Sequence, residues 1–251
     1  MDDALISYLR LALSSASAVV YFYVGARLGR RRVGGDARLA AQLFSTWWIL
    51  LGALTAGGIV QSMLALSKVS DLALYEMLVE VELLILVAAF WALLYYLSYV
   101  LTGSRRAMIP ITAFYAGIFL WLLYIVDSIQ YDRVDIVGAT ATLHSATTVD
   151  PTIGLVLLAL LLGPVLVGAV GYVRLYFQVE GRTQRYRIGL VAATLVTWFG
   201  SSGLATVSGA SKIAWWPLVS GLLGLAAAIC IFFAYQPPGF IQRRFGIEAV
   251  S

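Results

Sequence analysis

Seven long apolar stretches determine what this chain can fold into. They cover, approximately, residues 4–26, 39–66, 72–102, 107–129, 152–177, 186–207 and 213–235. A helix needs about 20 mostly apolar residues to cross the roughly 30 Å of hydrocarbon in a bilayer, and every stretch reaches that length. The segments of a membrane β-barrel alternate and are only about 10 residues long. The sequence therefore predicts an all-α, polytopic membrane protein, with residues 1–251 forming a single domain of seven transmembrane helices.

The overall composition agrees with a multi-pass membrane protein. Hydrophobic residues make up 61% of the chain and charged residues 12%, whereas a soluble domain has about 45–50% and about 25%. A soluble fold is excluded, and so is a disordered chain, which requires low hydrophobicity and high charge. Most of the 15 arginines lie in short connectors, where they act as topology signals. We therefore expect the lipid bilayer of the cell membrane as a partner, and no nucleic acid.

The basic residues predict the orientation of the seven helices. If the helices alternate in direction, 13 positive charges fall on one side and three on the other. The larger group consists of Arg27, Arg30, Arg31, Arg32, Arg38, Arg105, Arg106, Arg174, Arg182, Arg185, Arg187, Arg243 and Arg244, and the smaller of Lys68, Arg133 and Lys212. Lys and Arg accumulate on the cytoplasmic side of membrane proteins. We expect the amino terminus outside and the carboxyl terminus inside.

One connector is long enough to form structure of its own. Residues 131–150 contain several β-branched residues around a turn signal at Gly138, which predicts a short outer hairpin. Two interpretations remain open, a lid over a pocket or a simple connector.

Small residues and prolines indicate how the helices pack. Ser220, Gly224 and Ala228 recur at four-residue steps, a spacing that allows two helix backbones to approach closely in lipid. Packing within the bundle and a homo-oligomer interface explain the pattern equally well. Pro164 is expected to kink its helix, because proline removes a backbone hydrogen bond.

The inventory of reactive residues argues against an enzyme and against a bound metal or cofactor. His144 is the only histidine and Cys230 the only cysteine, so haem, zinc and copper sites lack ligands within the membrane. Residues 200–203 match the GxSG string of rhomboid intramembrane proteases, but no histidine follows them in the chain. Ser201 and Ser202 are therefore interpreted as packing residues.

A retinal chromophore is also unexpected. Retinal-binding microbial rhodopsins carry a lysine in the middle of the last helix, and the only lysines here are Lys68 and Lys212, at predicted outer helix ends or loops.

Ionisable residues within the predicted spans are the main candidates for function, because a charge at the bilayer centre costs at least about 2.5–3.5 kcal/mol. Four qualify: Arg10, Glu76, Glu80 and Glu82. We expect Arg10 to pair with Glu80, with Glu76 as a second acceptor at similar depth. Glu82 follows Glu80 by two residues and should point about 200° away from it. The group is interpreted either as a sealed ion pair or as the polar floor of an outward-facing cavity.

In the second interpretation, the cavity would bind a small or lipophilic ligand. Its candidate residues are Arg10, Gln61, Glu76, Glu80, Asp127, Trp198, Trp215 and Trp216.

Two inner connectors resemble a known family. Residues 91–96 run into Leu-Thr-Gly-Ser-Arg-Arg at 101–106, and Arg-Thr-Gln-Arg-Tyr-Arg at 182–187 opens the sixth predicted helix. These strings resemble the seven-helix sensor region at the front of many prokaryotic histidine kinases, which has a Tyr-x-x-Gly-Arg-like turn and an Arg-x-Gln-x-Arg-like string at these places. The resemblance implies a sensor. The chain ends about 16 residues after the last predicted helix, so the output is expected to come from a partner.

Three functions therefore remain in view. The first is a stand-alone, receptor-like bundle that binds a ligand in its outer half and signals through a membrane or cytoplasmic partner. The second is a non-catalytic structural subunit of a larger membrane complex. The third is a small transporter that uses Glu76 and Glu80.

Overall fold

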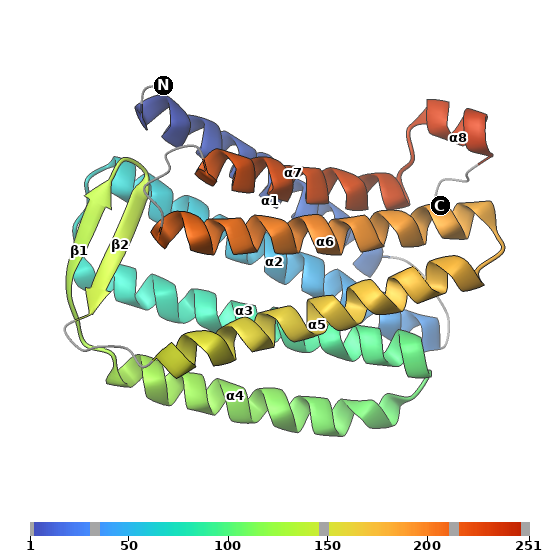
Figure 1. Ribbon diagram of the computed structural model, residues 1–251, viewed down its shortest axis with the longest axis horizontal. Coiled ribbons are helices and arrows are strands. Elements are labelled where there is room, and N and C mark those ends of the chain that lie inside the picture. Colours follow the sequence, from blue (N-terminus) through green and yellow to red (C-terminus); the bar gives the residue numbers. More distant parts are fainter. Residues whose placement is uncertain (1–2, 31–35, 146–150, 211–215, 247–251) are drawn as a thin grey trace. The chain divides into compact units, whose positions relative to one another are not determined.

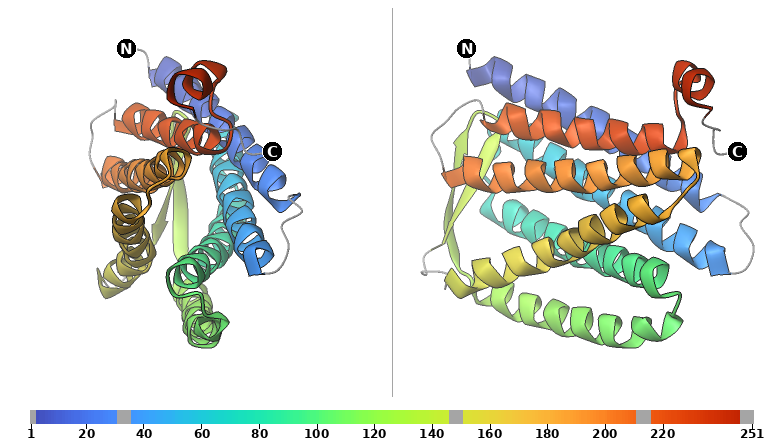
Figure 2. Two further views of the ribbon diagram at one scale, coloured as in Figure 1. Left: turned by 90° about the vertical axis from the view of Figure 1, so that its right-hand side faces the viewer. Right: turned by 45° about the vertical axis from the view of Figure 1, so that its right-hand side comes forward.

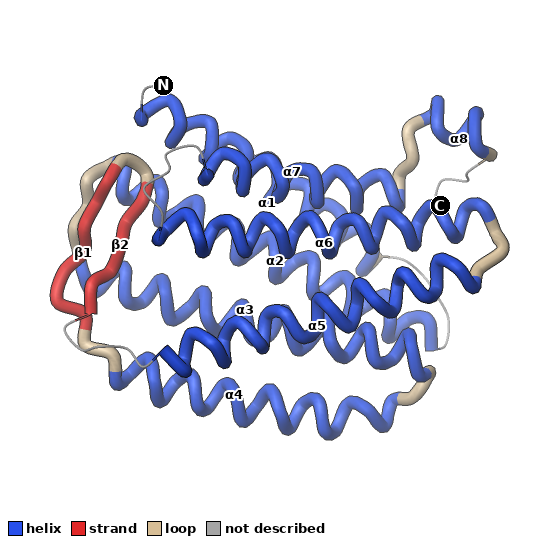
Figure 3. The backbone as a smooth tube through the Cα atoms, in the orientation of Figure 1, coloured by secondary structure: helices blue, strands red, loops and turns tan. Residues whose placement is uncertain are grey.

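The computed structural model describes residues 3–30, 36–145, 151–210 and 216–246, and this part of the chain is mostly helical (Figure 1, Figure 3). Its α-helices are α1 (Asp3–Gly29), α2 (Asp36–Leu66), α3 (Leu72–Thr102), α4 (Met108–Ser128), α5 (Pro151–Gln178), α6 (Arg182–Ala210), α7 (Trp216–Tyr235) and α8 (Gly239–Phe245). A 3-10 turn at Arg105–Ala107 precedes α4, and the strands β1 (Tyr131–Val137) and β2 (Thr140–Ser145) lie between α4 and α5.

Each of the seven predicted spans coincides with one long helix, α1 to α7. Within the described residues, five helical segments are long and apolar enough to cross a membrane. They are Leu5–Gly29, Arg38–Leu66, Leu72–Val100, Met108–Ile125 and Leu218–Tyr235. The prediction of a mostly helical protein is therefore confirmed, and these five segments agree with a protein embedded in a membrane.

The chain divides into two compact units, Met1–Leu161 and Leu162–Ser251. Helix α5 begins in the first unit and ends in the second. The two units are described separately below.

Local sequence signals define both ends of α3. The Asp71 side chain accepts a hydrogen bond from the Leu74 backbone N–H at 3.3 Å, which satisfies one of the unpaired donors of the first helical turn. At the other end, Gly103 has a φ of 67° and donates its N–H to the Tyr99 carbonyl oxygen at 2.8 Å. This left-handed conformation is accessible to glycine without a steric penalty, and it ends the helix at the connector to α4.

The first unit is built on a row of four helices. α1 packs on α2, α2 on α3, and α3 on α4, so that each helix contacts its neighbours in the chain (Figure 2). An aromatic cluster lies between α1, α2 and α3: the Tyr21 and Trp48 rings lie 5.4 Å apart and the Phe44 and Tyr96 rings 4.5 Å apart. Trp47 and Trp48 are fully buried within it. These contacts join α1, α2 and α3 through large rings.

The backbones of α1 and α2 approach each other closely at Gly25. A Cβ at this position would lie 2.7 Å from Ile49 Cγ1 and 3.1 Å from the Ser45 carbonyl oxygen. The Ser45 hydroxyl donates to the Gly25 carbonyl oxygen at 2.7 Å. Gly25 and Gly29 form a small-xxx-small pair of the type that brings membrane helices together, a contact that was not expected from the sequence.

The predicted hairpin between the fourth and fifth long helices is present. β1 and β2 pair antiparallel, with Val137 opposite Thr140. Gly138 begins the two-residue turn with a φ of 58°, the conformation that makes glycine the preferred residue there. The hairpin lies across one end of the helix row, where β1 contacts α3 and β2 contacts α2 (Figure 1). The Ala139 backbone N–H donates to the Ser7 hydroxyl on α1 at 3.3 Å.

The second unit contains the tightly packed pair α6 and α7. Two serines join these helices by reciprocal hydrogen bonds. The Ser201 hydroxyl donates to the Ser220 carbonyl oxygen at 2.7 Å, and the Ser220 hydroxyl donates to the Ser201 carbonyl oxygen at 2.9 Å. The geometry agrees with the packing interpretation of Ser201 and of the small residues at Ser220 and Gly224.

Helix α8 was not expected from the sequence. It follows two prolines, begins at Gly239, and ends before Gly246, whose φ is 62°. Phe240 is exposed and Arg243 and Arg244 lie in the last turn. At seven residues, α8 is too short to be recognised in the sequence as a membrane span. For that reason the sequence did not predict it.

Candidate ligand-binding groove

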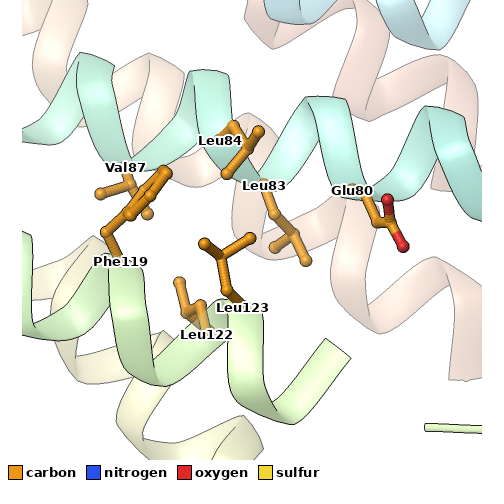
Figure 4. A pocket seen from close by; sticks show the side chains of 7 residues that line it. All are labelled: Glu80, Leu83, Leu84, Val87, Phe119, Leu122 and Leu123. Atoms are coloured by element: carbon orange, nitrogen blue, oxygen red, sulfur yellow. The ribbon is translucent and has the colours of Figure 1, made fainter. Parts of the chain in front are cut away.

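A groove opens between α3 and α4 in the first unit (Figure 4). Its volume is about 250 Å³, including its open mouth. The apolar side chains that line it are Leu83, Leu84 and Val87 from α3 and Phe119, Leu122 and Leu123 from α4. The Glu80 carboxylate lies at one end, as Figure 4 shows. The groove is therefore lined by apolar side chains, and Glu80 is the acidic residue of the lining, at one end.

Helical periodicity explains why these residues line one surface. On α3, the lining residues follow Glu80 at three-, four- and seven-residue steps, which places them on one face of a helix. At a rise of 1.5 Å per residue, the stretch from Glu80 to Val87 is about 10 Å long. One turn beyond Val87, the Trp91 Nε1–H donates to the Thr112 hydroxyl at 3.0 Å and links α3 to α4. This bond ties the two helices together past the deep end of the groove.

The mouth of the groove is negatively charged. Glu76 lies one turn before Glu80, and it is half-buried while Glu80 is exposed. Burial raises the pKa of the Tyr131 phenol above its usual value, and the charges of Glu76 and Glu80 raise it further. Tyr131 is the first residue of β1, so the hairpin begins beside both carboxylates.

The expected ion pair between Arg10 and Glu80 does not form among the described residues. Arg10 Nη1 instead donates to the Thr140 hydroxyl on β2 at 3.5 Å. The row of helices explains the difference: Arg10 is on α1, which packs on α2, whereas Glu80 lies on the side of α3 that faces α4. The second acceptor, Glu76, also has no ion pair with Arg10 in the described part of the chain.

Glu82 points away from Glu80, as the helical spacing predicts. A Cβ on Gly57 of α2 would lie 2.7 Å from Glu82 Oε1, so the carboxylate rests on the α2 backbone. The Gln61 side-chain amide hydrogen-bonds to the same carboxylate, while Oε1 is buried and has no hydrogen-bond partner. Gln61 therefore belongs to the contact between α2 and α3 and does not line the groove.

None of the remaining candidates with a described side chain lines the groove. Trp198 lies on α6 in the second unit. Trp215 lies outside the described residues, and the side chains of Trp216 on α7 and Asp127 on α4 also lie outside them. His144 is on β2, with its Nε2 atom 2.8 Å from Asp135 Oδ2 on β1.

Sequence reasoning identified Glu80 and Glu76 but missed the six apolar lining residues. The signal for the α3 face was present, since Leu83, Leu84 and Val87 continue the face that begins at Glu80. In a helix that is apolar all round, however, hydrophobic periodicity does not distinguish a groove from a surface that contacts lipid. Only the position of α4 in the structure shows that this face of α3 lines a groove.

No protein-family model matches the sequence, and no curated protein matches it significantly.

Proposed function

We propose that this chain is a seven-helix, receptor-like membrane protein that binds a lipophilic ligand in the groove between α3 and α4. The observation that carries the proposal is the groove itself, an apolar channel with Glu80 at its mouth. Ligand sites are typically concave and mostly apolar, with a few polar groups that fix orientation. The groove has the same kind of lining, six apolar side chains and one acidic side chain.

In this proposal all seven long helices cross the membrane, with the hairpin outside. The first unit supports the orientation, because α1 begins, α2 ends, α3 begins and α4 ends near the hairpin, whereas Arg27, Arg38, Arg105 and Arg106 belong to the opposite helix ends. Basic residues at one set of helix ends favour the cytoplasmic side for that set. The groove then opens in the outer half of the protein.

A receptor-like role follows from where the groove lies in the chain. A ligand between α3 and α4 would change how these helices pack, and they are joined by the connector that contains Arg105 and Arg106. The similarity of this connector to the sensor region of histidine kinases favours signalling through a partner. The interface between α3 and α4 is less extensive than that between α1 and α2, so it is the contact that a ligand could alter most readily.

Ligand-induced stabilisation tests the proposal. Dodecanol, a neutral single-chain probe, is added to the purified protein in detergent, and the thermal midpoint is measured. We expect the midpoint to rise, since a ligand that binds only the folded state stabilises it by mass action. Leu123→Trp should abolish the rise by filling the groove.

Leu120→Trp is the matched control on the same helix. Leu120 does not line the groove and is 66% exposed, compared with 41% for Leu123. An equal rise for both variants and the wild type would indicate non-specific partitioning and would contradict the proposal.

A further inference from the structure

The groove has an unbalanced charge at its mouth. Glu80 and Glu76 lie one turn apart on α3, and neither has an ion pair among the described residues. Two cationic residues of the first unit have other partners there: Arg10 hydrogen-bonds to Thr140, and Arg133 lies 3.9 Å from Asp135. The protein thus presents two carboxylates beside an apolar channel without supplying the compensating charge.

The dimensions of the groove limit what can occupy it. Its stretch along α3 is about 10 Å long, and it ends one turn before the Trp91 to Thr112 hydrogen bond that links the helices. Its volume of about 250 Å³ includes the solvent at the open mouth, so the groove is an open apolar surface between two helices and not an enclosed cavity. A lining of this length can cover part of a single hydrocarbon chain.

Charge complementarity then selects among single-chain molecules. An anionic headgroup would be repelled by both carboxylates. A neutral headgroup would leave them uncompensated near the membrane, where charge is costly. A cationic headgroup provides the missing charge, while its chain covers the apolar residues deeper in the groove.

We propose that the groove selects single-chain amphiphiles with a cationic headgroup, the headgroup beside Glu80 and Glu76 and the chain along Leu83, Leu84 and Val87. This inference rests on the proposed function and adds the chemical class of the ligand. Discrimination against anionic amphiphiles arises from repulsion as well as from the favourable contact with cations.

The test compares three probes with the same hydrocarbon chain: dodecyltrimethylammonium, dodecanol and dodecyl sulfate, each added at the same small mole fraction relative to the detergent. Binding is measured by the thermal midpoint of the full-length protein in a neutral detergent. We expect the cation to bind at least about tenfold more tightly than dodecanol, because an opposite charge at close range contributes in that order even near a protein surface. Dodecyl sulfate should bind more weakly than dodecanol.

The Glu80→Gln variant distinguishes the contribution of the headgroup to binding from that of the hydrocarbon chain. This variant should lose the preference for the cation and retain the binding of dodecanol, because the apolar lining is unchanged. Glu180→Gln is the matched control: Glu180 is an exposed carboxylate in the second unit, so the cation preference should persist in this variant.

The outcomes distinguish the two proposals. Equal binding of cation and alcohol by the wild type would overturn the headgroup inference and leave the groove as a ligand site. An unchanged cation preference in Glu80→Gln would also overturn it. A failure of all three probes to bind would instead contradict the proposed function.

Discussion

At the scale of residues, position on α3 determines what each acidic side chain contacts. Glu80 is exposed at the mouth of the groove, whereas Glu82, two residues later, rests on the α2 backbone at Gly57. The 200° rotation between such positions sends one carboxylate toward α4 and the other toward α2. The same residue type therefore lies at the mouth of a groove in one place and packs against a neighbouring helix in the other.

The ionisation of Tyr131 offers a direct measure of the charge at the groove. Glu76→Gln and Glu80→Gln should each lower the pKa of Tyr131 toward the usual value of about 10, and burial should maintain part of the shift. NMR of ring-labelled tyrosine as a function of pH measures this pKa. A Tyr131 pKa unchanged by both substitutions would contradict the placement of β1 beside the carboxylates.

The same shift links alkaline pH to stability. Because folding raises the pKa of Tyr131, the folded state holds the phenolic proton more tightly than the unfolded state does. The resulting stabilisation is complete below about pH 10 and is lost as the pH rises through the folded-state pKa. Tyr131→Phe should therefore reduce the loss of stability above pH 10.

At the scale of elements, the helices are joined by different kinds of contact. Close backbone approach joins α1 to α2 at Gly25, large rings connect α2 to α3, and paired hydroxyls connect α6 to α7. Lipid is as apolar as a leucine side chain, so helices in a membrane associate through packing and hydrogen bonds more than through the hydrophobic effect. Single substitutions at these contacts should therefore have specific effects.

Gly25→Ala should strongly destabilise the protein. The added methyl group would lie 3.1 Å from two backbone atoms of α2, so the helices would have to separate. Overpacking of this kind typically costs about 1–3 kcal/mol. Unfolding in a mixed detergent system measures the change.

Gly117→Ala is the control for this experiment, because a Cβ there meets no atom within 4 Å. It should leave the stability unchanged or raise it slightly, since alanine favours helix more than glycine. Similar losses for both variants would indicate that the contact at Gly25 is not close.

The serine pair of α6 and α7 should show energetic coupling. Ser201→Ala and Ser220→Ala each remove one of the two hydrogen bonds between the helices. Side-chain hydrogen bonds between membrane helices contribute about 0.6 kcal/mol on average and up to about 1.7 kcal/mol. A double-mutant cycle on the unfolding free energy measures the coupling. Strict additivity would mean that the two hydroxyls act independently.

At the scale of the whole molecule, the expected orientation depends on 13 basic residues on one side and three on the other. In a Cys230→Ala background, a cysteine at Thr142 on β2 should react with an impermeant maleimide added outside intact cells. A cysteine at Arg244 on α8 should react only after the membrane is opened. Reaction of the Arg244 position from outside would contradict the orientation.

The sequence alone determined the class of fold and the extent of its long helices. The length of the apolar stretches and the lack of alternating apolar and polar residues are sufficient for this. A helix that crosses a bilayer needs about 20 apolar residues, and it satisfies its backbone hydrogen bonds internally. Gly138 similarly predicted the hairpin, since its turn requires a positive φ. These properties depend on residues that are close together in the chain.

Only the tertiary structure decided which helices are neighbours. The sequence indicated that Arg10 and Glu80 have similar depths, and similar depth suggested an ion pair. The row of helices instead places Arg10 beside Thr140 of the hairpin and Glu80 at the groove against α4. In apolar helices every face can contact either lipid or protein, so the pattern along the chain does not specify partners. The groove is formed by packing between two such faces, and for that reason it became visible only in three dimensions.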